Sequence, residues 1–506
     1  MKQDIIVNPS NVVEKTKTLS AGDRVVFTPG RYTERLSFSD LSGQPDQAIE
    51  FFAEPGAVLD GGQRFEDFNP RAQQISEEQE KLGKYPGIQT IIMEGFFVFT
   101  NCDWVTVRGF YVEGVWPTVI AIDNCRHVLI DDFHIRESTF AVFAMGPETE
   151  HIIVENCNWL QDITKGDLWF RIGWHQMHDG PAKPNDSRAY DGDFFRAVNI
   201  RGNVTIRNNT VSHAFNGVHM YNRNKDKTLN NNVRIYGNTF NYIRDNPIEP
   251  ENAASNWWVY NNRMFNCHKW FSFEMAVSGY FFVFGNVGWF DSLPGPISDD
   301  QYGGAVFKLP VSTEVTEGKH YVFHNSWYLR SSYIKKKHLP RFYHFNNAIQ
   351  YCQPGNHGAF ENQPMCVPAK PFFGKGASIP PKTPYDVKKQ FTREWDELDI
   401  KFFNDVIGHQ DYPANLRLMG YDIGQATSGS PSFVNPMTGD LRLDVDSPCR
   451  GQAVSVDVEL ADGTTWTIPG GCDVGAYQGD DLFRLPLSDR DHDRALSFNS
   501  DMMDRA

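Results

Sequence analysis

Short runs of β-branched and aromatic residues recur along the chain, beginning with VTVRGF (105–110), VLIDDF (128–133) and IIVENC (152–157). Each run is about five residues long and ends at Gly, Asn or Asp, which tolerate the left-handed corner between two coils. A repeat of this kind predicts the stacked coils of a parallel β-helix. The later runs begin at Val204, Val233, Trp257, Phe281, His320 and Phe342.

The spacing of these runs predicts the length of one coil. From Val105 onward the steps are 23, 24, 52, 29, 24, 24, 39 and 22 residues. Most steps fall between 22 and 29 residues, as one coil requires. The step of 52 residues indicates either two coils or one coil that carries an insertion.

Two asparagine–cysteine pairs have the same register relative to the strand that follows them. Asn101-Cys102 and Asn124-Cys125 lie three residues before Val105 and Val128, respectively. We therefore expect the two pairs to stack in neighbouring coils as a buried ladder. Metal binding is less favoured, because no His or Cys at ligand spacing joins them.

Composition restricts the class of protein. Hydrophobic residues make up 40% of the 506 residues, which is typical of a globular protein, and no apolar stretch approaches the ~20 residues of a membrane span. The net charge of −15 argues against a nucleic-acid partner, because phosphate binding needs clustered Lys and Arg. The N-terminal MKQDIIVNPS has no apolar signal core, so we expect either a cytoplasmic protein or one whose signal peptide is absent from this sequence.

Eight cysteines leave the compartment open. Cys352 with Cys366, and Cys449 with Cys472, close short intervals that would suit disulfides in an oxidising compartment.

The two ends of the repeat carry a family resemblance. AGDRVVFTPGRYTERLSF (21–38) and IEFFAEPGAVLDGG (49–62) resemble the N-terminal cap and first coils of right-handed parallel β-helix proteins of the pectin-lyase-like superfamily. PSFVNPMTGDLRLDVDSPCRGQ (431–452) and CDVGAYQGD (472–480) resemble the segment that closes many bacterial members. The resemblance covers roughly residues 20 to 480 and implies an all-β fold, a single right-handed parallel β-helix with an N-terminal cap and long loop insertions.

The expected domain organisation follows from the breaks in the repeat. We predict one β-helix domain over residues 1–485, with insertions at about 158–200 and 353–425, and a charged C-terminal tail at 486–506 that is loosely packed. Within the second insertion, EWDELDIKFFNDVIG (394–408) is predicted to form a short helix on the flank.

Three consecutive coils, aligned on Asn209, Asn238 and Asn262, bring polar side chains to one sheet face. The stretches GVHMYN (217–222), PIEPEN (247–252) and SFEMAV (272–277) place their polar residues ten to thirteen residues after these corners. Alternate residues of a strand share a face, and neighbouring strands lie about 4.8 Å apart. The outward positions predicted in this way are His219, Tyr221, Glu249, Glu251 and Glu274, with Lys308 in GGAVFKLP of the next coil.

This arrangement suits glycoside hydrolysis, which needs two carboxyl groups roughly 5 to 9.5 Å apart, one protonated and one ionised. Glu249 and Glu251 are expected about 6.6 Å apart on one strand. We predict Glu249, Glu251 and Glu274 as acid and base, with His219 and Tyr221 positioning the sugar. Two other interpretations stay open, namely ordinary surface charge and a calcium site.

The insertion at 158–200 is the second source of candidates, because long insertions in a compact repeat often bind ligands. Trp169 and Trp174 present flat faces suited to sugar rings, with His175 beside them. Arg171 and Arg196 are candidates to bind a sulfate or carboxylate, as is Arg188, and Lys308 is a further substrate-binding candidate. The alternative is that the tryptophans pack on the flank of the helix.

These features together predict a secreted or periplasmic enzyme that degrades a polysaccharide, most consistent with a glycoside hydrolase acting on an anionic chain. No cofactor is required by this chemistry, although Ca²⁺ is possible. The alternatives are a polysaccharide lyase or uronan C5-epimerase that abstracts the C5 proton through Tyr221, His219 or Lys308, and a non-catalytic glycan-binding protein. The expected partner is a polysaccharide.

Overall fold

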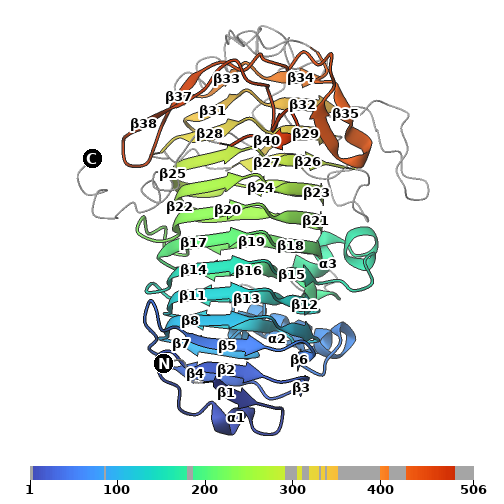
Figure 1. Cartoon of the computed structure of the whole chain (residues 1–506). Helices are drawn as coiled ribbons and strands as arrows, with labels where there is room; N and C mark the ends of the chain where they lie inside the picture. Colours follow the sequence, from blue (N-terminus) through green and yellow to red (C-terminus); the bar gives the residue numbers. More distant parts are fainter. Residues whose placement is uncertain are drawn as a thin grey trace. The chain divides into compact units, whose positions relative to one another are not determined.

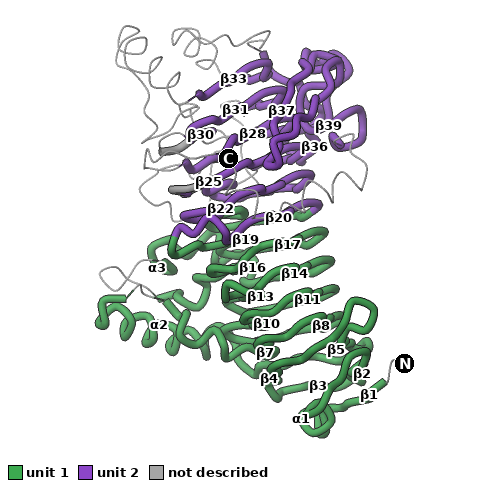
Figure 2. The backbone as a smooth tube through the Cα atoms, turned by 90° about the vertical axis from the view of Figure 1, so that its left-hand side faces the viewer, with its two compact units in different colours: residues 1–224, 238–249, 294–301 green, residues 225–237, 250–293, 302–506 purple. Residues whose placement is uncertain are grey.

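The computed structural model describes residues 4–84, 87–178, 186–290, 305–309, 318–329, 332–336, 339–351, 399–408 and 429–484. The chain divides into two compact units, which are described separately (Figure 2). Unit 1 comprises residues 1–224, 238–249 and 294–301, and unit 2 comprises residues 225–237, 250–293 and 302–506.

In unit 1 the chain coils through three columns of parallel strands (Figure 1). The first column contains β1 (Asp4–Val7), β2 (Arg24–Phe27), β5 (Ile49–Ala53), β8 (Asp103–Arg108), β11 (Arg126–Asp131), β14 (Glu150–Glu155) and β17 (Gly202–Arg207). The second contains β3 (Gly30–Tyr32), β6 (Ala57–Asp60), β9 (Tyr111–Glu113), β12 (His134–Arg136), β15 (Asn158–Leu160), β18 (Thr210–Ala214) and β21 (Thr239–Ile243). The third contains β4 (Leu36–Ser39), β7 (Phe97–Thr100), β10 (Thr118–Asp123), β13 (Phe140–Met145), β16 (Asp193–Val198) and β19 (Asn216–Tyr221).

The register of the first column matches the predicted repeat. Val105 pairs with Val128, Val128 with Ile152, and Ile152 with Val204. The step of 52 residues is therefore one coil with an insertion rather than two coils. These ladders confirm the expected all-β, right-handed parallel β-helix.

Corner residues hold neighbouring coils of unit 1 together. Cys102 and Cys125 are buried, and the Cys102 amide donates to Cys125 Sγ at 3.2 Å, so this part of the predicted ladder is confirmed. The prediction of burial is wrong for Asn101, which is exposed, and Asn124 is only half-buried. At another corner, Asn209 donates its backbone and side-chain N–H groups to Asn238 Oδ1, each at 3.0 Å.

Helix α2 (Phe65–Lys81) and the helices of the insertion lie over the third column of unit 1, and we call them together the helical wall. Helix α2, which the sequence analysis did not predict, buries Phe68 and Ala72, and the Phe68 ring stacks on Trp116 at 5.5 Å. The insertion after β15 adds η2 (Asp167–Arg171), α3 (Trp174–His178) and η3 (Arg188–Tyr190). Figure 2 shows α2 and α3 projecting from the same side of unit 1. One apolar cluster joins α2, the insertion, Trp116 just before β10, and β13.

Unit 2 has the same type of ladder. Its first column contains β20 (Asn231–Tyr236), β22 (Ile248–Tyr260), β25 (Glu274–Phe284), β28 (His320–Phe323), β31 (Phe342–Phe345) and β33 (Lys401–Phe403). The second contains β23 (Arg263–Cys267), β26 (Val287–Trp289), β29 (Ser326–Leu329), β32 (Ala348–Tyr351) and β34 (Val406–Gly408). The third contains β24 (Lys269–Ser272), β27 (Ala305–Leu309) and β30 (Ser332–Lys336).

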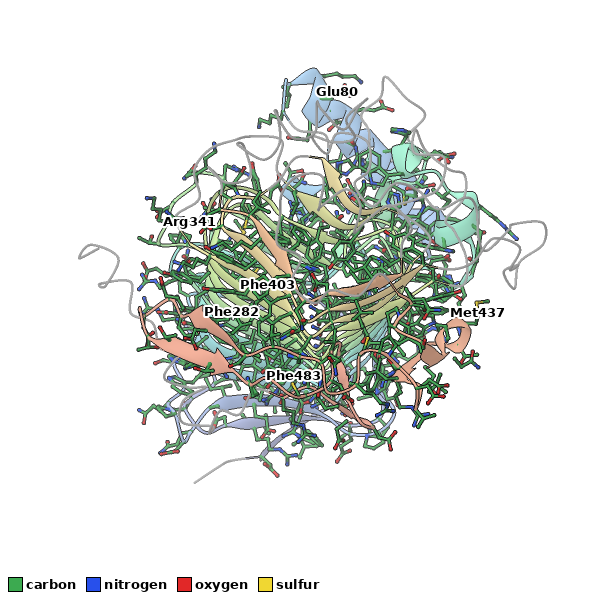
Figure 3. All side chains as sticks on the ribbon, turned by 90° about the horizontal axis from the view of Figure 1, so that it is seen from above. Glu80, Phe282, Arg341, Phe403, Met437 and Phe483 are labelled. Carbon is green, nitrogen blue, oxygen red and sulfur yellow. The ribbon has the colours of Figure 1, made fainter. Side chains whose placement is uncertain are left out.

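Residues 399–408 correct one expectation. The predicted helix over 394–408 is wrong for this part, which forms β33 and β34 and so adds a coil. KFFND (401–405) repeats the strand-and-corner pattern, and Phe403, which is labelled in Figure 3, stacks on Phe345 at 5.1 Å. Residues 353–398, 409–425 and 486–506, including Cys366, lie outside the described residues, as does Cys352.

The last described residues of unit 2, 429–484, form three antiparallel hairpins that pack on its columns. They pair β35 (Phe433–Asn435) with β36 (Asp440–Leu443), β37 (Val456–Glu459) with β38 (Thr465–Ile468), and β39 (Tyr477–Gln478) with β40 (Asp481–Leu482). Phe483, also labelled in Figure 3, stacks on His324 at 4.1 Å.

Cys449 and Cys472 are free thiols, so the disulfide suggested for this pair does not form in the structure. No described helix is both long enough and apolar enough to cross a membrane.

Candidate functional site

The site begins on the third column of unit 1, where apolar side chains give way to polar ones. Ala121, Phe143, Arg196 and His219 are successive register partners on β10, β13, β16 and β19. The first two belong to the buried core, whereas Arg196 and His219 are polar. The helical wall covers Phe143, so the change from Phe143 to Arg196 marks the edge of the covered face.

Four side chains meet at this edge, and we call Asp193, Arg196, His219 and Glu249 the sheet-face cluster. His219 Nδ1 lies 3.4 Å from Asp193 Oδ1 and 3.3 Å from Glu249 Oε2. Arg196 Nη1 lies 3.5 Å from Asp193 Oδ2 and contacts the His219 ring, with Nε2 at 3.2 Å. Two carboxylates, a guanidinium and an imidazole therefore share one contact region.

Backbone bonds fix this arrangement. The Val218 amide donates to the Pro247 carbonyl at 2.7 Å, and the Gly217 amide donates to the Asn246 carbonyl at 2.9 Å. A Cβ on Gly217 would come within 2.3 Å of the Pro247 carbonyl oxygen, so only glycine allows this close approach. The bonds place Glu249 next to His219 at the start of β22.

The sheet-face cluster is largely withdrawn from water. Asp193 is 2% exposed, Glu249 6% and His219 7%. Burying carboxylates is costly unless cations or hydrogen bonds compensate, and Arg196 with His219 supplies that compensation. Asp193 Oδ1 has no hydrogen-bond partner within the usual limits, so its interaction with His219 is a longer electrostatic contact.

The two carboxylates lie close enough to cooperate. Because Asp193 Oδ1 and Glu249 Oε2 both contact His219 Nδ1, they are no more than about 6.7 Å apart, the sum of 3.4 and 3.3 Å. Carboxyl pairs of retaining glycosidases are roughly 5 to 5.5 Å apart, and those of inverting enzymes begin at roughly 6.5 Å. The separation is compatible with paired acid–base chemistry.

The structure distributes the six sheet-face predictions over both units. His219 and Glu249 belong to the sheet-face cluster, and Tyr221, half-buried, lies two residues further along β19 with Val198 as its register partner. Glu251, Glu274 and Lys308 belong to unit 2. There Glu251 on β22 pairs in register with Glu274 on β25, as the coil alignment predicted, and Lys308 on β27 pairs with Ser272 on β24.

The predicted sugar-stacking role of Trp169 is wrong. Its side chain is 0% exposed and contacts the Tyr242 ring edge-on at 5.8 Å, so both of its faces are covered by protein. The alternative interpretation, packing on the flank, applies to this residue. Arg171 is exposed and pairs with Asp167 at 2.9 Å. Trp174 and His175 are half-buried, with ring centroids 5.4 Å apart.

A second histidine–carboxylate pair lies in the insertion. His178 Nδ1 lies 3.2 Å from Asp191 Oδ1, and Arg188, which is fully buried, pairs with Asp191 Oδ2. Burial by itself raises the pKa of Asp191, but the charges of His178 and Arg188 outweigh it and lower the value to about 2. Burial lowers the pKa of His178, whereas the Asp191 carboxylate raises it, and the net shift is upward.

Sequence reasoning missed both aspartates. Asp191 and Asp193 form a D-x-D pair directly before and at the start of β16, with the same spacing as Glu249 and Glu251. They were not predicted because the prediction aligned strands on corner asparagines, and these two residues follow the insertion instead. Their spacing before the strand FFRAV (194–198) was the available signal.

In the described part of the chain, no group of three or more His, Cys, Asp and Glu side chains is arranged to hold a metal ion.

Comparison with known proteins gives similarities of fold. No family model matches the chain, and no curated protein matches it. An alginate lyase from Paenibacillus sp. str. FPU-7 is 11% identical, with 75% of this chain and 99% of that chain covered and a TM-score of 0.36.

Two further solved structures extend the comparison to hydrolases. A Family 28 exopolygalacturonase from Yersinia enterocolitica is 10% identical, with 74% of this chain and 78% of that chain covered and a TM-score of 0.38. A GH136 lacto-N-biosidase from Eubacterium ramulus is 11% identical, with 74% and 65% covered and a TM-score of 0.38. These similarities include lyases and hydrolases, so the reaction has to be argued from the site.

Proposed function

We propose that this protein cleaves a polysaccharide as a glycoside hydrolase, with Glu249 and Asp193 as the carboxyl pair. The observation that carries the proposal is their common contact with His219 Nδ1, which limits their separation to about 6.7 Å. Hydrolysis needs one carboxyl group to protonate the leaving oxygen and another to act as base or nucleophile.

The surroundings of the pair suit a division of roles. Arg196 pairs with Asp193, and we assign Asp193 as the base or nucleophile and Glu249 as the proton donor. His219 contacts both carboxylates.

The other predicted residues keep proposed roles. Glu251 and Glu274 are proposed as further acid–base groups, and Tyr221, Lys308, Arg171 and His175 as sugar contacts. The anionic character of the polysaccharide and a secreted or periplasmic location also belong to this proposal. The anionic character is supported by the guanidinium of Arg196 on the sheet face, which suits a carboxylate or sulfate.

One observation favours a second candidate reaction. Arg196 contacts the His219 ring directly, which places a possible base beside a group able to neutralise a uronate carboxylate. This arrangement suits β-elimination or C5 epimerisation, in which the C5 proton is removed from a uronic acid.

The test begins with a screen of uronic and sulfated polysaccharides, read by both new reducing ends and ultraviolet absorbance. Hydrolysis yields reducing ends alone, whereas β-elimination also yields an unsaturated sugar that absorbs. An absorbance rise that matches the reducing ends would replace the hydrolase proposal with the lyase.

The roles of the carboxyl pair are then tested on the substrate that the screen identifies. We expect Glu249→Gln and Asp193→Asn each to lower kcat by about 10² to 10⁴. Glu150→Gln is the matched control, because Glu150 is also a largely covered carboxylate of unit 1 that pairs with arginines, on β14. Near-normal turnover in both site variants would exclude the pair.

A further inference from the structure

Both basic side chains of the sheet-face cluster have a carboxylate beside them. Arg196 Nη1 lies 3.5 Å from Asp193 Oδ2, and His219 Nδ1 lies 3.3 Å from Glu249 Oε2. Two carboxylates thus face one guanidinium and one imidazole, so the cluster offers no excess of positive charge to a bound oxyanion. An anionic polysaccharide would need a further cation near this face.

The chain that leaves β19 carries a cation of this kind, Arg223. Tyr221, the last residue of β19, shares a face with His219 and lies about 6.6 Å further along the strand, at 3.3 Å per residue. Arg223 follows two residues later and is exposed. Neither the Arg223 guanidinium nor the Tyr221 hydroxyl has a partner among the residues that the structure describes.

Asn199, the corner residue after β16, fixes the backbone of this segment. Its amide donates to the Tyr221 carbonyl at 2.9 Å, and its side-chain Oδ1 accepts the Arg223 amide at 2.7 Å. The two bonds hold both ends of residues 221–223, so the Arg223 side chain starts from a fixed backbone position. A group held in this way loses less conformational entropy when it binds a ligand.

Another corner of the third column makes the same bond with a residue of opposite charge. The Glu148 amide donates to Asn124 Oδ1 at 3.3 Å, as the Arg223 amide does at its own corner. Glu148 is neutralised within the chain, because it pairs with Arg126 and, at 3.2 Å, with Arg201. Arg223 has the equivalent position and no counterion among the described residues, which leaves its charge available to a ligand.

We propose that Arg223 binds an oxyanion substituent, a carboxylate or a sulfate, on a sugar unit next to the one held over the sheet-face cluster. Its planar fork of N–H donors matches two oxygens of either group. Tyr221 donates its hydroxyl to the same substituent, and Asn199 is a positioning residue. This inference rests on the proposed function for its ligand class, although it concerns recognition of the charge and not cleavage.

The contact is tested by affinity electrophoresis of the full chain in gels cast with alginate, polygalacturonate or carrageenan. Methyl-esterified polygalacturonate and agarose are the uncharged counterparts. All variants are made in a Glu249→Gln background, so that cleavage does not remove the ligand. We expect Arg223→Gln to weaken retardation by about tenfold in a charged gel and to change nothing in the uncharged ones, as the loss of one charge-assisted hydrogen bond implies.

Two further comparisons define the substituent and the part played by charge. A loss confined to the alginate or polygalacturonate gels assigns a carboxylate, and a loss confined to carrageenan assigns a sulfate. Arg223→Lys keeps the charge and should recover most of the retardation, whereas Tyr221→Phe should lose less than Arg223→Gln.

Arg136 supplies the matched control, because it is also an exposed arginine of unit 1 but ends β12 on the second column. Arg136→Gln should bind as the background does. Unchanged retardation of Arg223→Gln, an equal loss in Arg136→Gln, or no retardation of the background protein in any charged gel would each overturn the assignment. If Glu249→Gln and Asp193→Asn both retain turnover while Arg223→Gln loses binding, the proposed carboxyl pair fails and the anion site stands.

Discussion

His219 is the residue that contacts all the other members of the sheet-face cluster. Its Nδ1 contacts a carboxylate from β16 and another from the start of β22, and its ring receives the Arg196 guanidinium. Neighbouring strands lie about 4.8 Å apart, so only side chains in adjacent coils can meet in this way. A substitution at His219 would release all three partners, whereas changes at Glu249 or Asp193 isolate one role each.

Asp191 makes a pH-dependent contribution to stability. Its pKa is lowered from 3.8 to about 2, so its ionised form is favoured in the folded state. The contribution is present above 3.8 and is lost as the pH falls toward 2, and a shift of this size corresponds to about 2 kcal/mol. We expect the difference in unfolding free energy between wild type and Asp191→Asn to shrink over that pH interval.

The measurement is denaturant unfolding of both proteins across this pH range. Asp186→Asn, which removes an exposed carboxylate of the same insertion, is the control and should show little difference at any pH. A difference for Asp191→Asn that stays constant down to pH 2 would contradict the prediction.

At the scale of elements, the insertion and α2 form a wall that covers part of the sheet and leaves the sheet-face cluster at its edge. Asn69 of α2 accepts the Ala189 amide at 2.9 Å, and Phe65 stacks on Tyr190 at 4.2 Å. Segments more than 100 residues apart in sequence thus become one structure. The wall sets the boundary of the site because it withdraws Phe143 and its neighbours from solvent.

Trp169 is predicted to stabilise the wall rather than bind sugar. Because its ring is fully buried, Trp169→Ala should lower the unfolding free energy by about 3 to 5 kcal/mol. The neighbouring Arg171→Ala, on an exposed side chain, should change it by less than about 0.5 kcal/mol. Denaturant unfolding measures both, and equal small effects would show that the ring is not part of the packed wall.

The asparagine ladder of unit 2 is a second structural element with a measurable role. Asn286 donates to the Val259 carbonyl at 2.9 Å and to Asn325 Oδ1 at 3.0 Å, and it accepts from the Asn262 amide at 3.1 Å. Asn286→Ala leaves these buried groups without partners, which should cost about 2 to 4 kcal/mol of unfolding free energy. Asn158→Ala, at an exposed position, should cost less than about 0.5 kcal/mol.

Denaturant unfolding with far-ultraviolet circular dichroism compares the two asparagine variants. A loss in Asn286→Ala no larger than that in Asn158→Ala would mean that the ladder follows from the coil without stabilising it.

At the scale of the whole molecule, the repeat explains how much of the fold was predictable. The repeated strands align as predicted, because strand propensity and corner asparagines act locally. These strands include those with Val105, Val128, Ile152 and Val204. Two local predictions failed for the same reason. These are the helix over 394–408 and the sugar-stacking role of Trp169. Both depend on which coil or helix the segment packs against, and the local sequence does not contain that information.

The candidate site was only partly predictable. Glu249 and His219 were found because both follow corner asparagines at similar distances, and the Glu251–Glu274 register was found in the same way. Asp193 was missed because an insertion separates it from the preceding corner. The charge balance of −15 gave no guidance here, since the sheet-face cluster mixes both signs in one buried place.

The sequence by itself determined the coil, because a repeated strand closed by Asn or Gly can bury its apolar face only against the next copy of itself. It also determined which strands carry His219, Glu249 and the other polar side chains. The tertiary structure decided which of these side chains meet. Contact between Asp193, Arg196, His219 and Glu249 depends on where the insertion returns the chain to the sheet, and on the helical wall that covers the coils beside them.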